Sequence, residues 1–413
     1  MDEQNTMTSQ TDTQISKGLY LPIQKSVITD ANDEKALALA GEIIRNGDLV
    51  SFPTETVYGL GANALDPEAA TKIFTTKERP MTDPLIVHIS EKSEALDLID
   101  EDENMLEIFN ILADKFWPGP FTCCLRANSN TISPVITADT GYVGIRCPNH
   151  PVAQKLLKEA QRPICAPSAN KFGHVSPTKP THVLSDFEND QVYILDGGAC
   201  DFGIESTVVK FYYEETSDPE KLQIKLLILR RGGISEKALK NAVKEIKLKN
   251  EGIEIVVECV EKKHFTEESH KMEAPGQFLR HYAPNLPSYM LSETKIDSEE
   301  IGKDLKLSSC VMLDFHKQNV DLKDKCSLYL DLSERGDYIE AINKVYDYLR
   351  ISETQEDGEM VIIANLTTTY DGDSDDSSHN EHSSALFDRL FRAVTGQCIQ
   401  VNEDFSKYII SKL

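Results

Sequence analysis

The sequence predicts two α/β domains joined by a linker, and three observations lead to this prediction. The chain has 413 residues, which is too long for one ordinary domain. Short apolar runs typical of strands alternate with amphipathic helical patterns, and few two-residue hairpin turns separate them. A charged, irregular stretch at residues 247–287 interrupts this pattern. We therefore expect a twisted mixed-sheet α/β domain, a linker, and a smaller three-layer α/β domain.

Composition sets the expected domain boundaries. Residues 1–24 are polar and have neither the apolar region of a signal peptide nor the arginines of a transit peptide, so we expect a disordered tail. The first domain is expected at residues 25–246, the linker at 247–287 and the second domain at 288–413. The second domain should contain two or three strands and as many helices.

The expected helices have clear starts and stops. Asp66 and Pro67 suit the cap and first turn of a helix, and Pro80 resists its continuation beyond about Lys77. Gly47 closes an earlier helix, and Ser235 caps a later one. The expected helices cover residues 30–46, 66–77, 105–116, 151–159, 238–246, 338–349 and 385–393.

The expected strands are apolar runs bounded by proline, glycine or polar turns. Pro53, for example, stops the run at 49–52 because proline cannot donate to a sheet ladder. The expected strands cover residues 27–28, 49–52, 84–89, 121–125, 142–147, 163–166, 192–195, 207–211, 224–229, 311–315, 327–332 and 360–364.

Charge and cysteine usage exclude several classes of protein. The formal net charge of -25 argues against a chain that binds nucleic acid over its whole surface. The nine cysteines show neither CxxC nor Cys/His finger spacing, which favours reduced thiols in the cytoplasm over a disulfide frame or structural zinc. No apolar run approaches the ~20 residues of a membrane span, so no membrane partner is expected.

Gly59-Leu60-Gly61-Ala62-Asn63-Ala64 matches the pattern of dinucleotide-binding loops, but its context differs from theirs. Such a loop needs its first glycine at the strand end and a helix that opens within the glycines. Here the helix start appears only at Asp66, so a nicotinamide cofactor is disfavoured. There is no GxxxxGK[ST] motif for a P-loop either.

Cations at strand ends give the stronger signal. Lys77 and Arg79 could simply be solvated residues at a helix C-terminus. However, Arg146, Arg230 and Arg231 also fall at expected strand ends beside Ser/Thr/Asn loops, which suits recognition of polyphosphate or carboxylate. Cations and hydroxyls without an obvious acid/base pair favour transfer at phosphorus, where positioning and charge neutralisation supply most of the rate. His88 lies in an apolar strand and is either a core histidine or a ligand.

An ordered set of motifs resembles the long form of the YrdC-domain family, the threonylcarbamoyl-AMP synthases. The motifs are FPTETVYGLG, KxRPxxxPLIVH, WPGP, RCP, APSAN, DGG, EST and PGxxxxHYAP. The resemblance covers most of residues 25–290, and beyond it only Ala385, Arg389-Leu390 and Ala393 are similar to the family's C-terminal helix. It implies a YrdC fold, a twisted α/β sheet with a concave basic cleft.

The resemblance also implies an activity. Members of the family condense L-threonine, bicarbonate and ATP into threonylcarbamoyl-adenylate and pyrophosphate, a nucleotidyl transfer. The product feeds a separate tRNA threonylcarbamoyl transferase complex that modifies the adenosine beside the anticodon, and the resemblance allows a contact with tRNA itself as a further partner. Mg²⁺ is expected to arrive with ATP, held mainly by the nucleotide and water, because the chain shows no dedicated carboxylate cage.

Motif by motif, the resemblance assigns site residues. Those implied to bind threonine are Thr56, His88, Arg146 and Ser206. Those implied to lie around ATP are Lys77, Arg79, Asp83, Tyr142, Ser168, Ser176 and Arg230. Asp83 and Tyr142 stand where the family often has asparagine and threonine, and Leu279 stands where an archaeal-type linker has tyrosine.

Residues 274–285, which we call the lid segment, are expected to fold over the catalytic cleft. A proline-glycine bend is followed by a cation, an imidazole and an aromatic ring before another proline, whereas a simple tether would be polar and flexible. The residues expected to matter are Pro275, Gly276, His281 and Tyr282.

Two alternatives remain open from the sequence. One is a non-enzymatic RNA-binding module that uses a basic concave face on tRNA or ribosomal RNA, although such modules favour stacking aromatics and a lysine stripe. The other is carbamoyl transfer to another acceptor, which would share the nucleotide site and differ at the threonine pocket.

Overall fold

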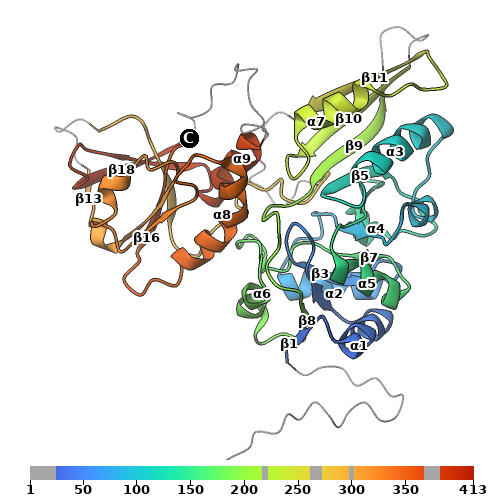
Figure 1. The fold of residues 1–413 in the computed structure, drawn as a ribbon, viewed down its shortest axis with the longest axis horizontal. Helices are drawn as coiled ribbons and strands as arrows, with labels where there is room; N and C mark the ends of the chain where they lie inside the picture. The colour runs from blue at the N-terminus through green and yellow to red at the C-terminus, as the bar shows by residue number, and fades with distance from the viewer. Residues whose placement is uncertain (1–24, 216–221, 261–271, 297–301, 367–381) are drawn as a thin grey trace, which may run out of the picture.

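The computed structural model describes residues 25–215, 222–260, 272–296, 302–366 and 382–413. These residues form two α/β units, each built on its own sheet (Figure 1). The tail expected at residues 1–24 lies outside the described residues. None of the helices in the described part of the chain is both long and apolar enough to cross a bilayer.

The first unit is built on a mixed sheet of eleven strands. Parallel pairs such as β4 with β6 alternate with antiparallel pairs such as β5 with β6. In spatial order the strands are β1 (Val27–Asp30), β8 (Tyr193–Asp196), β2 (Val50–Phe52), β3 (Gly59–Asn63), β7 (Ile164–Cys165), β4 (Ile86–His88), β6 (Tyr142–Arg146), β5 (Phe121–Arg126), β9 (Thr207–Glu214), β10 (Leu222–Arg230) and β11 (Ile253–Cys259).

Helices cover both faces of this sheet, but not all of it. Helices α1 and α5 pack on one face against Val50 and Phe52, while α2, α3 and α7 pack on the other. The capping residues expected from sequence do cap: the side chains of Asp66 and Ser235 accept hydrogen bonds from the first turns of α2 and α7. The helices are α1 (Glu34–Arg45), α2 (Pro67–Lys77), α3 (Glu103–Phe116), α4 (Pro134–Thr137), α5 (Pro151–Ala160), α6 (Pro180–Phe187) and α7 (Glu236–Lys244), with a 3₁₀ helix η2 (Lys92–Asp97).

Strand β11 was not expected, because residues 247–287 read as linker. It pairs in parallel with β10, and Ile253, Ile255 and Val257 pack partly buried against the first core. Charged residues surround the alternating apolar residues of this strand, so the sequence pattern did not indicate a strand here. The first sheet therefore extends beyond residue 246.

The second unit has a larger sheet than the two or three strands expected. Within the described residues this sheet has seven strands: five neighbouring strands are parallel, and the two added at one edge are antiparallel. The missed strands are short or carry polar residues at an edge. In spatial order, the strands of this sheet are β13 (Lys303–Asp304), β18 (Lys407–Lys412), β17 (Gln397–Val401), β12 (Ser288–Leu291), β16 (Met360–Ile363), β14 (Cys310–Asp314) and β15 (Leu328–Asp331), of which β14, β15 and β16 were expected.

Both long helices of the second unit face the first unit. Helices α8 (Tyr338–Ser352) and α9 (Ser383–Ala393) pack on one face of the sheet, and Figure 1 shows them on the side toward the first domain. The opposite face is covered by loops with the 3₁₀ helices η3 (Leu307–Ser309) and η4 (Val320–Leu322). Val57, Val175 and Ile204 of the first unit join the same apolar cluster as α8 and α9. The two units therefore share a core.

Candidate active site

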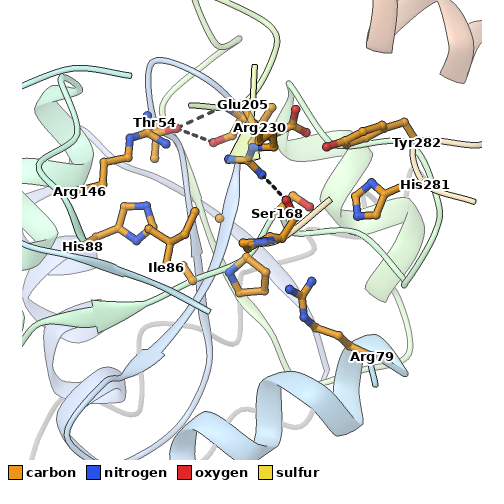
Figure 2. Close-up of a pocket in the computed structure, with 15 residues that line it drawn as sticks. Thr54, Arg79, Ile86, His88, Arg146, Ser168, Glu205, Arg230, His281 and Tyr282 are labelled. Atoms are coloured by element: carbon orange, nitrogen blue, oxygen red, sulfur yellow. Dashed lines mark hydrogen bonds between the residues drawn. The ribbon is translucent and has the colours of Figure 1, made fainter. Parts of the chain in front are cut away.

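A pocket lies over a part of the first sheet that the helices leave uncovered. Its floor is formed by the ends of neighbouring strands, and Figure 2 shows Arg146 and His88 on one side, Arg79 with His281 and Tyr282 on the other, and Arg230 between them. The lining residues are Thr54, Val57, Gly59, Arg79, Ile86, His88, Arg146, Ala166, Pro167, Ser168, Glu205, Arg230, Pro275, His281 and Tyr282.

Parallel pairing of β4 and β6 brings two of the expected residues together. His88 and Arg146 are register partners at the carboxyl ends of these strands. The Nδ1 atom of His88 lies 3.3 Å from the carbonyl oxygen of Ile164, which can only accept, so Nδ1 donates and Nε2 is left as an acceptor. Burial, with Arg146 nearby, lowers the pKa of His88 to about 3. The imidazole is therefore neutral near pH 7.

The guanidinium group of Arg146 has partners at one nitrogen and an unpaired donor at another. Its Nη2 donates to Thr56 Oγ1 at 2.9 Å and forms an ion pair with Glu55 Oε1 at 2.7 Å. Its Nε is buried and has no hydrogen-bond partner among the described residues. A buried donor without a partner costs free energy. This N–H group is therefore suited to bind an anionic group that enters the pocket.

Arg79 is positioned by the loop that follows α2. Its Nη2 lies 2.9 Å from Asp83 Oδ2 and donates to the Pro84 carbonyl oxygen at 2.8 Å. Asp83 is fully buried, and burial raises its pKa to about 6 even though Arg79 and Lys77 act in the opposite direction. Asp83 thus contacts the site through Arg79 and does not itself line the pocket.

Lys77 has a different environment from the one expected. Its ammonium group donates to the carbonyl oxygen of Ser168 at 2.6 Å and to that of Asn170. The side chain is 1 % exposed, does not line the pocket, and burial lowers its pKa well below the usual value. In this structure Lys77 therefore fixes the turn that presents Ser168 to the pocket.

Arg230 connects the pocket to the strand end that carries Ser206. Its Nε and Nη2 donate to the carbonyl and hydroxyl oxygens of Ser206, both at 3.1 Å, and its Nη1 lies 3.3 Å from the Pro275 carbonyl oxygen. The Ser206 hydroxyl also lies 2.7 Å from Thr122 Oγ1. Ser206 is thus placed against the guanidinium group rather than directly on the pocket wall.

Glu205 is a pocket residue that the sequence analysis identified only as part of the EST motif. Its carboxylate accepts from Ser176 Oγ at 2.7 Å and from Tyr346 OH at 2.9 Å, and pairs with Arg389 Nε at 2.8 Å. Burial by itself raises the pKa of Glu205, but Arg389 and Arg230 outweigh it and hold the pKa below the usual value. The EST motif was visible in the sequence, whereas its partners on α8 and α9 were not.

The lid segment closes the side of the pocket opposite the sheet. Pro275, His281 and Tyr282 line the pocket, and Gly276 is also buried. Gly276 has φ +86°, and a Cβ there would lie 2.6 Å from the Tyr282 hydroxyl oxygen, so only glycine fits. The buried His281 Nδ1 and Tyr282 OH have no hydrogen-bond partner within the described part of the chain. Together with Arg146 Nε, they leave polar atoms available for a ligand.

Two positions that depart from the resembled family lie away from the pocket. Tyr142 stands at the opposite end of β6 from Arg146, with the Lys210 ammonium 4.2 Å from the centre of its ring. Leu279 is half-buried near Gly396 of the second unit. Neither lines the pocket.

The residues present do not form a magnesium cage. Among the described residues, no group of three or more His, Cys, Asp or Glu side chains is arranged to hold a metal ion. The buried carboxylates nearest the cations, those of Glu55, Asp83 and Glu205, are already paired with Arg146, Arg79 and Arg389. A divalent ion at this site would have to be held by other donors.

Comparison with known proteins agrees with this architecture. Residues 42–232 match the Sua5/YciO/YrdC family model, described as telomere recombination, and residues 234–395 match the model of the threonylcarbamoyl-AMP synthase C-terminal domain. The chain is 36% identical to the threonylcarbamoyl-AMP synthase of Bacillus subtilis over 262 residues, which are 63% of this chain and 68% of that protein. It is 39% identical to the synthase of Pyrococcus abyssi over 253 residues, 61% of this chain and 67% of that protein.

A solved structure extends the likeness to both units. The crystal structure of P. abyssi Sua5 complexed with L-threonine superposes with a TM-score of 0.66 at 29% identity, covering 89% of this chain and 96% of that one. The sequence matches, the shared two-unit fold and the pocket on the first sheet agree with one another. The chain therefore belongs to the long-form, two-domain Sua5/YrdC family of threonylcarbamoyl-AMP synthases.

Proposed function

We propose that this protein is a nucleotidyltransferase that makes threonylcarbamoyl-AMP from L-threonine, bicarbonate and ATP, with release of pyrophosphate. One observation carries the proposal: a single pocket joins Arg146, with its free buried N–H, to the guanidinium groups of Arg79 and Arg230. An amino-acid carboxylate and a polyphosphate could bind there side by side. The names of the relatives support threonylcarbamoyl-AMP as the product, and the L-threonine complex of P. abyssi Sua5 supports threonine as a substrate.

The reaction proceeds in two steps. The threonine amine attacks the bicarbonate carbon, a C–N bond forms and water leaves, which gives a carbamate. A carbamate oxygen then attacks the α-phosphorus of ATP. The new O–P bond replaces the bond to the bridging oxygen, whose electron pair leaves with pyrophosphate.

The chain's own residues position these reactants. Arg146 Nε binds the threonine carboxylate, and the neutral His88 offers Nε2 as an acceptor to threonine's amine or hydroxyl. Arg79 and Arg230 offset the charge of the phosphates. Lys77 acts one step further away, by holding the Ser168 turn in place. Orientation and charge neutralisation together supply the rate.

The proposal includes Mg²⁺ bound to the ATP phosphates and water, because the described residues lack a carboxylate cage for it. Neither step of the reaction is assigned to that ion. All nine cysteines are free thiols, which supports a reducing compartment such as the cytoplasm. The adenylate would be passed to a tRNA threonylcarbamoyl transferase complex. The rival RNA-binding role gains little support, because Arg79, Arg146 and Arg230 are buried and not a surface stripe.

Pyrophosphate release tests the proposal directly. Purified protein should release pyrophosphate from ATP and Mg²⁺ only when both threonine and bicarbonate are present. Serine and alanine serve as matched controls for the amino-acid site. Equal turnover without any amino acid would overturn the threonine assignment and leave the nucleotide site intact. Equal turnover with another carbamoyl acceptor would favour a related transferase.

A further inference from the structure

We propose that Arg389 and Arg392, three residues apart on α9 of the second domain, are positioning residues for the pocket in the first domain. Arg389 keeps Glu205 from competing for Arg230, and Arg392 holds the lid segment closed. The second domain is on this view a structural part of the site. The inference rests on the proposed function insofar as ATP is taken as the ligand of the pocket. The contacts of Arg389 and Arg392 are independent of that function.

Arg389 reaches from α9 into the wall of the pocket. Its Nε donates to Glu205 Oε2 at 2.8 Å, and its Nη2 donates to the Arg231 carbonyl oxygen at 2.8 Å. Its guanidinium carbon lies 5.1 Å from the centre of the Tyr282 ring. The side chain is 0 % exposed. A guanidinium group so fully buried is tolerated only when paired, so Arg389 and Glu205 depend on each other.

Arg392 contacts the lid segment directly. Its Nη1 donates to the carbonyl oxygens of Gln277 and Phe278, at 2.9 and 2.6 Å. Asp388 accepts from Arg389 Nη1 at 3.1 Å and from Arg392 Nε at 3.2 Å, so one carboxylate orients both arginines. Residues three or four apart share a face of a helix, which is why α9 can bind the pocket wall and the lid at once.

Helix α8 adds a third contact to the same place. Tyr346 donates to Glu205 and stacks on Tyr282, with ring centroids 5.4 Å apart and planes 28° apart. Glu205 and Tyr282, which both line the pocket, are therefore enclosed by side chains of the second domain. Neither would keep this environment if the second domain moved away.

The charges explain why the contact matters for a polyphosphate. Glu205 forms an ion pair with Arg389 and lines the same pocket as Arg230, which donates hydrogen bonds to the neighbouring residue Ser206. Arg389 satisfies the carboxylate, so Arg230 can remain on Ser206 and face the pocket. Without Arg389, the carboxylate would be left with Arg230 as its cation. It would then compete with ATP phosphates for that group.

The first test measures the lid segment without any substrate. Arg392→Met in the full chain should accelerate amide hydrogen exchange in residues 274–283 by about tenfold, because two hydrogen bonds to the lid are lost. Exchange in β14 and β16 should be unchanged, which shows that the second domain stays folded. Arg335→Met is the matched control, since Arg335 is an exposed arginine of the same domain that pairs only peripherally with Glu340. Unchanged exchange in the lid segment of Arg392→Met would overturn this half of the proposal.

The second test measures ATP binding by calorimetry. Arg389→Met should weaken ATP binding at least tenfold, and adding Glu205→Gln should recover much of that loss because the competing charge is gone. A purely structural role predicts the reverse, a further loss in the double variant, and that result would overturn the competition. If Arg389→Met does not fold, the double variant Arg389→Met/Glu205→Gln still tests the proposal. ATP binding near the wild-type level supports it, and a folded double variant that does not bind ATP contradicts it. Neither readout needs threonine turnover, so failure of the proposed function would be recognised separately.

Discussion

At the scale of single residues, Asp83 shows how one carboxylate can restrain a cation that lines the pocket. Its only ion-pair partner among the described residues is Arg79, and its pKa is raised to about 6 by burial. Burial therefore stabilises the neutral acid, and the charged form, which is present above that pKa, should compete with a bound phosphate for Arg79. Asp83→Asn should tighten ATP binding at pH 7.5 by about threefold to tenfold.

The same residue predicts a pH dependence that calorimetric titration can check. Wild-type affinity for ATP should rise as the pH falls through about 6, where Asp83 becomes neutral. The Asp83→Asn variant retains the titration of ATP itself but lacks that of the side chain, so it is the control. Identical pH profiles for the two proteins would show that Asp83 does not restrain Arg79.

Arg146 offers a second prediction at the residue scale. Arg146→Ala should weaken threonine binding by about 2–5 kcal/mol, because a buried charged partner of the carboxylate is lost. The single variant also leaves Glu55 buried without its cation. Glu55→Gln and the double variant Glu55→Gln/Arg146→Ala separate this effect on folding from the effect on binding. Near wild-type threonine affinity in the folded double variant would remove Arg146 from the site.

At the scale of elements, the lid segment should protect the adenylate, a mixed anhydride, from water. Gly276→Ala places a Cβ 2.6 Å from the Tyr282 hydroxyl oxygen and should displace the lid. We expect pyrophosphate release to continue with less intact adenylate accumulating. Gly141→Ala is a matched control, because Gly141 has a similar φ of +78° and a Cβ there would meet no atom of the described residues within 4 Å beyond its chain neighbours. It carries the same backbone strain, roughly 1–2 kcal/mol, without the contact.

A second variant makes the lid prediction specific. Gly276→Ala combined with Tyr282→Phe removes the hydroxyl group that the new methyl group meets, and should restore part of the adenylate yield. Chromatography of the nucleotide products against total pyrophosphate measures the ratio. A ratio equal to wild type in Gly276→Ala alone would show that residues 274–285 merely connect the domains.

At the scale of the whole molecule, a histidine between two carboxylates should make domain docking depend on pH. His174 of the first domain lies 2.9 Å from Asp186 Oδ2 and 3.0 Å from Glu353 Oε2 of the second. Burial alone would lower the pKa of His174, and Arg350 acts in the same direction, but the hydrogen bonds to Asp186 and Glu353 raise it overall. The pKa of Asp186 is lowered to about 2, because its bonds to His174 and Arg350 outweigh the effect of burial.

The sign of the pH effect follows from these shifts. The His174 contribution is full below its unfolded pKa of about 6.5 and is lost as the pH rises through the raised native value. The Asp186 contribution is present above its unfolded pKa of about 3.9 and is lost as the pH falls toward the native value. Both contributions to the stability of the folded protein are therefore present between about pH 4 and 6.5. Part of each should be lost when the domains separate, because Glu353 and Arg350 belong to the second domain. Small-angle scattering from pH 6 to 9 should show the two domains of the wild-type protein moving apart as the pH rises. In His174→Gln the separation of the domains should not depend on pH. The same pH dependence in the variant as in the wild type would contradict the role of His174.

Local patterns in the sequence determined most of the individual elements of this protein. Capping by Asp66 and Ser235 acts within one turn of helix, and the apolar runs of β4, β5 and β6 are long enough to mark buried strands. The same locality explains the errors. The strands that the sequence did not predict, β11 of the first sheet and β12, β13, β17 and β18 of the second, are stabilised by pairing with their neighbours. Their own residues carry too weak an apolar pattern to indicate a strand.

The sequence by itself also determined which side chains could recognise an anion, since Arg79, Arg146 and Arg230 stood at strand ends beside hydroxyl-rich loops. Only the tertiary structure decided their roles. It turned Lys77 toward the carbonyl oxygens of a turn and paired Asp83 with Arg79. It also joined Glu205 to Arg389, which lies 184 residues later in the chain. Such pairings depend on burial and on contacts between distant segments, and neither quantity is contained in any local stretch of the chain.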